Sequence, residues 1–182
     1  LKAINKRDAS LETAFQQKLV AAAKKGALVV DNKDRLKGLS EAEIAAAAEA
    51  AKSRGLKGKY VIPLQNTTQQ PLLTSLANRS VREKLFRQSW MRAERGDAND
   101  TRATIERLAQ LRAEKTRLLG FPNVAAWTLQ DQMAKNPATV FAFMHKLAPA
   151  AVARARAEAR DIQSTIDKDQ KALGKPSCKL EP

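Results

Sequence analysis

The chain has 182 residues, of which 43% are hydrophobic and 29% charged, and this ordinary globular composition excludes a disordered or low-complexity protein. Its 33 lysines and arginines outnumber its 19 aspartates and glutamates, and the formal net charge of +14 favours a negatively charged partner. No apolar run approaches the roughly 18 residues of a membrane helix, and the first residues lack the core of a signal peptide. We therefore expect a cytoplasmic protein that binds no membrane.

The first predicted element is a helix at the start of the chain. Apolar side chains between Ile4 and Ala22 recur about every 3.6 residues, and Gly26 supplies a stop. Because the chain begins at Leu1, inside this helical pattern, we expect it to be a piece of a longer polypeptide.

Two short runs predict β-strands. Residues 27–30 end in β-branched side chains and precede the turn formers Asp31 and Asn32, and residues 59–64 follow a pair of glycines. We expect the runs to pair as a small ribbon, with Pro63 at an edge or at the end of its strand.

Capping boxes predict two helices in the first half of the chain. In such a box a serine hydroxyl and a glutamate carboxylate each satisfy a backbone N–H at the start of a helix. The box at residues 40–43 opens a helix to about Arg54, and the box at residues 80–83 opens one that Gly96 ends.

Three further helices follow from other signals. Thr68 or Pro71 can begin a short helix to Leu76, Asp100 can cap a helix to residue 119, and residues 124–133 form one of moderate length. The apolar stripe of the second comprises Ile105, Leu108, Leu111, Leu118 and Leu119.

A long helix is predicted to close the chain. Asn136 supplies an N-cap and Pro137 a first residue with a preset φ, whereas Pro149 should kink or split the helix. One helical face carries Val140, Met144, Leu147, Ala151, Ala155, Ala159, Ile162 and Ile166. Residues 171–182 are expected to be a frayed end.

The predicted fold class is therefore mainly α. We expect a single multi-helix lobe over residues 1–182, with a minor two-stranded β element at about Ala27–Val30 and Lys59–Leu64.

The sequence predicts no catalytic, cofactor-binding or metal-binding residue. The zinc-peptidase motif HExxH is absent, because the one histidine, His145, precedes Lys-Leu-Ala-Pro, and we expect it to be a surface or half-buried helix residue. With Cys178 as the one thiol, a zinc site would depend mainly on carboxylates, and no intramolecular disulfide can form. Residues 97–101 resemble the start of a calcium loop, but Arg102 stands where glycine is needed, so we predict a helix entry.

An alternative function is that of a basic helical binding module without enzymatic activity. The cations that suggest it are Arg79, Arg82, Lys84, Arg87, Arg92 and Arg95. They scatter around the predicted helix and alternate with Glu83 and Glu94, which is typical of a solvated face. Because Trp90 and Trp127 lie on apolar stripes, no base-stacking platform is predicted, and a nucleic-acid partner is not expected.

Several strings in the sequence resemble one family. Residues 59–71, KYVIPLQNTTQQP, resemble the corresponding stretch of bacterial peptidyl-dipeptidases, which are also called dipeptidyl carboxypeptidases. Further matching strings are ALVVD at 27–31, GLSE at 38–41, REKLF at 82–86, NDTR at 99–102, LLGFP at 118–122, AAW at 125–127 and DQMAK at 131–135. Since these strings are collinear and cover nearly the whole chain, it resembles the zinc metallopeptidases of the thimet-oligopeptidase-like group.

The resemblance implies a large, mostly helical, two-lobed cytoplasmic enzyme that encloses a deep substrate channel and holds zinc through HExxH and a later glutamate. Those residues lie downstream of the matched segment in the family, so none is carried over to this chain. The implied role is part of a zinc-dependent peptidyl-dipeptidase that releases C-terminal dipeptides, with this piece as a wall of the channel. Its implied partners are an oligopeptide substrate and the missing catalytic half, and the piece alone is expected to be inactive and without zinc.

Overall fold

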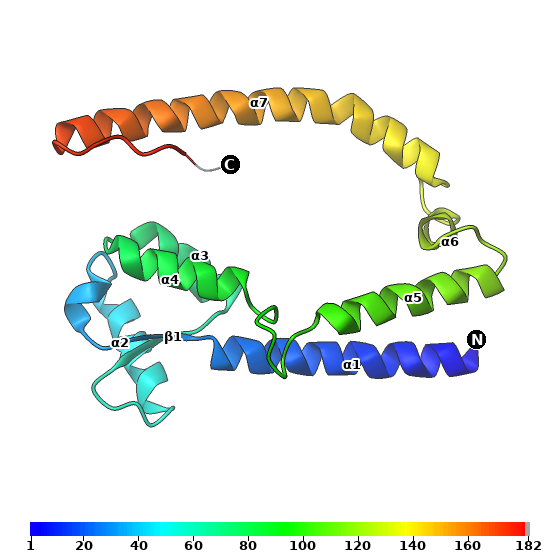
Figure 1. Cartoon of the computed structure of the whole chain (residues 1–182), viewed down its shortest axis with the longest axis horizontal. Helices are drawn as coiled ribbons and strands as arrows, with labels where there is room; N and C mark the ends of the chain where they lie inside the picture. The colour runs from blue at the N-terminus through cyan, green and yellow to red at the C-terminus, as the bar shows by residue number, and fades with distance from the viewer. Residues whose placement is uncertain (181–182) are drawn as a thin grey trace. The chain divides into compact units, whose positions relative to one another are not determined.

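The computed structural model describes residues 1–180, except for the side chains of residues 66–69. In this part the chain forms seven α-helices, one 3-10 helix and two short strands (Figure 1), which confirms the predicted mainly α class with a minor β element. The chain divides into two compact units at residue 118. A single lobe that contains both units stays a prediction.

The two predicted strands pair as a ribbon. Strand β1 (Leu28–Val30) runs antiparallel to β2 (Tyr60–Ile62), with Leu28 opposite Ile62. Pro63 follows β2 directly, at the position where a residue without an N–H can end a strand. The ribbon prediction is therefore confirmed, with each strand shorter than its apolar run.

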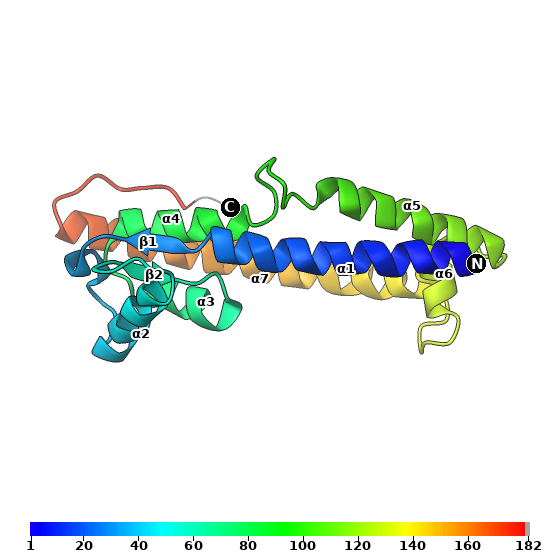
Figure 2. The same ribbon diagram turned by 90° about the horizontal axis from the view of Figure 1, so that it is seen from below.

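Two helices that lie far apart in the sequence form a hairpin in the first unit. Helix α1 (Lys2–Lys25) ends at Gly26 as predicted, and α5 (Arg102–Leu118) lies beside it (Figures 1 and 2). Across the hairpin, an Arg112 guanidinium nitrogen lies 2.8 Å from a Glu12 carboxylate oxygen. The pair links two helices that a long stretch of chain, residues 26–101, separates in the sequence.

The capping box that opens α2 (Glu41–Lys52) is confirmed. The Glu43 N–H donates to the Ser40 hydroxyl oxygen at 3.3 Å, and the Ser40 N–H donates to the Glu43 carboxylate at 2.7 Å. A 3-10 helix, η1 (Lys33–Leu36), precedes α2 and was not predicted, although the turn former Asn32 caps it.

The turn between η1 and α2 packs closely against the end of α3 (Asn66–Ser75). Gly38 has a φ of +96°, and a Cβ atom added there would lie 2.0 Å from the Ser75 carbonyl oxygen. Only glycine fits this crossing. Helix α3 begins before the predicted Thr68, whose side chain lies outside the described residues, and Pro71 lies within the helix.

Both predicted ends of the next helix, α4 (Arg79–Trp90), are wrong. The N-cap is Asn78, whose side chain accepts a hydrogen bond from the Val81 N–H at 3.2 Å, whereas the Ser80 hydroxyl donates to Asn78. Asn78, which precedes the predicted capping box at residues 80–83, thus starts the helix before the predicted position. The helix stops before Gly96 because Ala93, with a φ of +62°, already turns the chain away.

The core of the first unit gathers around the ribbon. Its buried members are Leu28, Val30, Leu36, Leu39, Ile44, Ile62, Leu64, Leu72, Leu76, Val81 and Leu85. They come from both strands, η1, α2, α3 and α4, so the small sheet is the element that these helices share.

The second unit consists of α6 (Val124–Leu129) and α7 (Pro137–Ala172). Asn123 and Asn136 cap the two helices, and the predicted start of α7 is confirmed. The prediction that α6 reaches Met133 is wrong, because a turn follows Leu129 and Met133 is fully exposed. None of the helices that the structure describes is long and apolar enough to cross a bilayer.

Helix α7 continues through Pro149 without a break. The helix bends in its first half but does not split (Figure 1). Of the two predicted effects of Pro149, the structure therefore shows the kink and not the split. After the helix, the chain turns back along it, and the Leu180 N–H donates to the Gln163 side chain at 2.7 Å.

Candidate functional site

The single histidine and the single cysteine are not part of a catalytic cluster. His145 is exposed on α7, as predicted, with its ring 6.2 Å from that of Phe141, and Cys178 is half-buried in the segment after α7. Within residues 1–180, no three His, Cys, Asp or Glu side chains are grouped so that they could hold a metal ion. The described residues therefore do not fit a zinc site.

The acidic loop before α5 is a helix entry, as predicted. The Asp100 carboxylate lies 2.6 Å from the Arg102 guanidinium and accepts the Arg102 N–H at 3.0 Å and the Gly96 N–H at 2.8 Å. The bonds from Arg102, and then that from Gly96, hold the pKa of Asp100 well below its ordinary value. This carboxylate fixes the loop and is not poised to accept a proton.

Asp97 has a similar structural role in the same loop. The Lys25 ammonium at the end of α1 donates to it at 2.8 Å, and the Asn99 N–H donates to its other oxygen at 2.9 Å. These two bonds lower the pKa of Asp97, with the Lys25 bond as the larger cause.

Two of the α4 cations serve local structure. Arg82 donates to the Leu76 and Ala77 carbonyl oxygens before the helix, and Arg87 pairs with Glu83 one turn earlier at 2.9 Å. The prediction of an ordinary solvated face fits these contacts.

The two α4 aromatics depart from the predicted apolar stripe. Trp90 is 72% exposed and stacks on Phe86, which is also exposed, with ring centroids 5.7 Å apart. Because α4 buries Val81 and Leu85 against the core, the neighbouring row of side chains faces outward. The two rings therefore lie outside the buried face of α4, while the expectation that they form no base-stacking platform stays a prediction.

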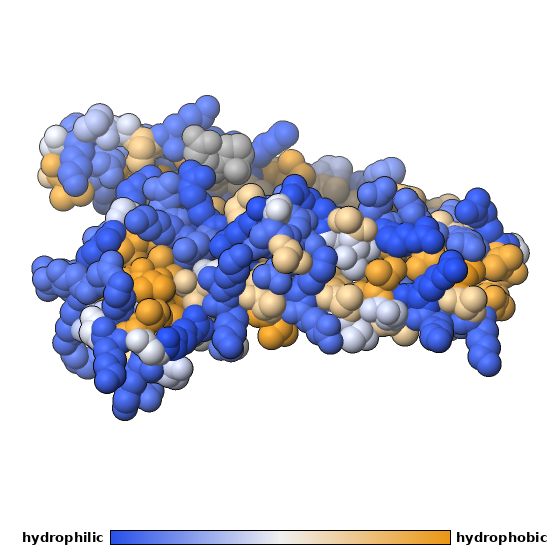
Figure 3. All heavy atoms as spheres, turned by 60° about the horizontal axis from the view of Figure 1, so that its bottom comes forward, coloured by the Kyte–Doolittle hydropathy of each residue, from blue (hydrophilic) through white to orange (hydrophobic). Residues whose placement is uncertain are grey.

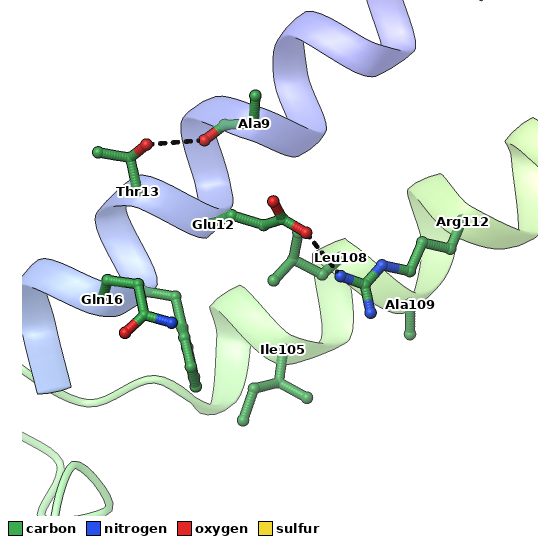
Figure 4. Close-up of a pocket in the computed structure, with 9 residues that line it drawn as sticks. Ala9, Glu12, Thr13, Gln16, Ile105, Leu108, Ala109 and Arg112 are labelled. Atoms are coloured by element: carbon green, nitrogen blue, oxygen red, sulfur yellow. Dashed lines mark hydrogen bonds and ion pairs between the residues drawn. The ribbon is translucent and has the colours of Figure 1, made fainter.

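An open groove of about 730 Å³ runs between α1 and α5 (Figure 4). Its lining comprises Ala9, Glu12, Thr13, Phe15, Gln16, Ile105, Leu108, Ala109 and Arg112. The Thr13 hydroxyl donates to the Ala9 carbonyl oxygen at 2.9 Å. The Glu12 carboxylate and the Arg112 guanidinium, which also line the groove, form an ion pair with each other. The groove thus offers apolar contact area but no activated nucleophile.

Apolar surface is also visible elsewhere on the first unit. Figure 3 shows an apolar patch toward the end that carries α2 and the ribbon, with hydrophilic side chains around it. A pocket of about 320 Å³ lies between α2, β2 and α3, and apart from Glu43 its lining is small or apolar, as in Ala47, Val61 and Leu72.

The predicted apolar stripe of α7 is present but uncovered. No residue of this helix is buried, and Met144, Leu147 and Ile162 each expose about half of their surface. Periodicity predicts which side chains share a face, but it does not reveal whether anything covers that face. A face of this kind fits a protein partner.

Comparisons with known proteins identify relatives along nearly the whole chain. Residues 72–182 match the profile of peptidase family M3. The chain is 53% identical over 170 residues to the dipeptidyl carboxypeptidase of Escherichia coli (strain K12), across 93% of this chain and 25% of that relative. It is 49% identical to the dipeptidyl carboxypeptidase of Salmonella typhimurium, with the same coverage. It is 30% identical to oligopeptidase A of Haemophilus influenzae over 90% of this chain and 24% of that protein. The chain spans about a quarter of the length of the curated relatives it matches.

Proposed function

Since the chain belongs to peptidase family M3, we propose that it is one part of a longer zinc-dependent dipeptidyl carboxypeptidase that releases dipeptides from the C-termini of oligopeptides. The observation that carries this proposal is the 53% identity to one dipeptidyl carboxypeptidase along 93% of the chain. Identity at this level over nearly every described element supports a shared local fold and a shared place in the enzyme. The same proposal assigns the longer protein to the cytoplasm.

In this proposal, zinc is bound by residues of the longer protein that lie outside this chain. The metal would supply the Lewis acid of the hydrolytic reaction. This assignment is supported by the scarcity of ligands here, since His145 and Cys178 are the one imidazole and the one thiol.

The role proposed for this chain is a wall of the substrate channel. Its ribbon and the helices around it form a compact core that can limit access to unfolded peptides. Its net charge of +14 suits a surface that faces an acidic remainder of the protein or attracts the free carboxylate of a peptide.

Peptide hydrolysis by the longer gene product tests the proposal. With zinc present, we expect it to release a dipeptide from an N-blocked tetrapeptide that ends in a free carboxylate, and to leave the C-terminal amide of the same peptide almost intact. The 182-residue chain alone should cleave neither peptide and should lose added zinc on dialysis. A gene product that lacks HExxH, or stoichiometric zinc retained by the chain alone, would contradict the proposal.

The second candidate is a basic binding module for single-stranded nucleic acid. The exposed stack of Phe86 and Trp90 beside the arginines of α4 favours it, because bases stack on such surfaces. It predicts retention of a single-stranded oligonucleotide that weakens steeply with salt, and loss of that retention in Trp90→Ala. Equal retention of the variant and the parent chain would remove this candidate.

A further inference from the structure

A second groove of the first unit is lined by three cationic side chains and by no carboxylate. It has a volume of about 530 Å³ and lies at the C-terminal end of α1, next to the segment that follows β2. Its lining comprises Leu19, Val20, Ala23, Lys24, Arg54, Pro63, Leu64, Gln65 and Arg92.

Backbone carbonyls hold both guanidinium groups of this groove in place. Arg92 donates through Nη1 to the Leu64 carbonyl oxygen at 2.9 Å, and Arg54 donates through Nη1 to the Lys24 carbonyl oxygen at 3.2 Å. A guanidinium carries five N–H donors, so each of these bonds leaves several donors for a ligand. The bonds thus position the two cations without neutralising them.

No acidic side chain offsets the charge of this groove. Among the described residues, Lys24, Arg54 and Arg92 form no ion pair, whereas the neighbouring Lys25 lies 2.8 Å from Asp97. Three cations that line one open groove favour an anionic ligand.

The rest of the lining is apolar. Val20 is 70% exposed, and it lies with Leu19 and Pro63 on the walls of the groove. An inorganic anion would use only the cations, whereas a molecule with both a carboxylate and an apolar group would also cover these side chains. The C-terminal residue of a peptide combines the two.

We propose that this groove binds the C-terminal residue of a peptide, with its carboxylate on Lys24, Arg54 and Arg92 and its apolar side chain against Leu19, Val20 and Pro63. The choice of a peptide as the source of the carboxylate rests on the proposed function. The site holds a peptide end and performs no bond cleavage.

Titration of the isotope-labelled 182-residue chain by NMR tests the inference. The probes are acetyl-Leu-Leu with a free carboxylate, the same peptide as its C-terminal amide, and sodium acetate. We expect the free acid to shift the amide signals of residues around the groove, and to bind about tenfold or more tightly than the amide or acetate.

Paired variants separate the groove from general charge. Arg54→Gln together with Lys24→Gln should weaken binding of the free acid by about tenfold, while Lys57→Gln, an exposed lysine that does not line the groove, should leave it within about twofold. The single variant Arg92→Gln should also weaken binding of the free acid. Its NMR spectrum must remain that of the folded chain for this comparison.

Equal affinity for acid and amide, or equal shifts with acetate, would overturn the inference. Shifts that map to other residues would do the same. These outcomes are distinct from failure of the proposed function. If the longer protein releases dipeptides but the chain ignores carboxylates, only the groove inference fails. If the chain binds the free acid but the longer protein cleaves nothing, only the peptidase assignment fails.

Discussion

Single side chains at the starts of helices carry much of the order in this chain. The Ser40 hydroxyl, the Asn78 amide and the Asn136 amide each accept a backbone N–H that has no partner within its helix. Such residues can be recognised in a sequence because the chemistry is local. Asn78 and Ser80 are both candidates for the N-cap of α4. Which of them caps the helix depends on which side chain reaches the free N–H groups, and the sequence alone does not rank the two.

Removal of the Ser40 cap should destabilise the first unit. Ser40→Ala deletes the hydroxyl that accepts the Glu43 N–H, and we expect a loss of about 1 kcal/mol in the free energy of unfolding, measured by urea titration. Ser10→Ala is the matched control, because Ser10 is exposed within α1 and alanine is favoured inside a helix. Equal losses in the two variants would refute the role of the cap.

The Asp100 carboxylate should make the chain sensitive to acid. Its pKa is lower in the folded chain than the ordinary value of about 3.9 in the unfolded chain, so the folded state binds the proton less readily. The stabilising contribution is therefore complete above pH 4 to 5 and declines as the pH falls below the unfolded value.

Thermal unfolding across pH measures this contribution. At pH 7, Asp100→Asn should lower Tm by roughly 2–4 °C, and the gap between the variant and the parent chain should narrow toward pH 2.5. Asp131→Asn, an exposed residue with no such pair, is the control. A gap that stays constant across this pH range would show that ionisation of Asp100 has no part in stability.

At the scale of elements, the starts of α2 and α7 and the end of α1 were predicted correctly, whereas the ends of α4 and α6 were not. The ribbon, α1, α2 and the start of α7 follow from local patterns, and the structure contains them. The end of α4 at Trp90 and that of α6 at Leu129 depend on how the following loop turns, and no single residue marked either position. The apolar stripe of α5 mixes buried and exposed members because α1 covers only part of it.

For the candidate sites too, features that depend on local sequence could be predicted, whereas features that depend on contacts between distant residues could not. The sequence predicted His145 to be a surface or half-buried helix residue, and the structure exposes it. The cationic groove was not predicted, because Lys24 comes from α1 and Arg54 and Arg92 come from the turns after α2 and α4, which the fold brings together. Their spacing in the chain carries no periodic signal.

Two leucines of α5 should respond very differently to truncation. Leu111 is completely buried, whereas Leu118 is 60% exposed, although both belong to the predicted stripe. Leu111→Ala should cost about 2–5 kcal/mol, because it removes buried methyl groups and leaves a cavity, and Leu118→Ala should cost well under 1 kcal/mol. Urea unfolding measures both values, and similar losses would mean that the far end of α5 is packed as tightly as its middle.

At the scale of the whole molecule, the second unit lacks a core of its own. None of the residues in α6 or α7 is buried, so this unit leaves apolar side chains in water that a stable domain would cover. The chain spans about a quarter of its relatives' length, and under the proposed function the remainder of the longer enzyme would cover these side chains.

The isolated chain should therefore associate with itself. We expect sedimentation velocity to show a species larger than 20.0 kDa whose fraction grows with concentration. Leu147→Glu with Ile162→Glu places charge on the exposed stripe and should restore the monomer, whereas Ala153→Glu on the opposite face should not. A monomer at all concentrations would contradict the prediction.

The hairpin of α1 and α5 has a consequence for synthesis of the protein on the ribosome. Glu12 and Arg112 meet across it although 100 residues separate them in the chain. At roughly 5–20 residues per second, Glu12 is synthesised about 5–20 s before Arg112. During that interval the apolar side chains of α1 lack their partner helix and are available to chaperones, and the hairpin can close only after α5 has been made.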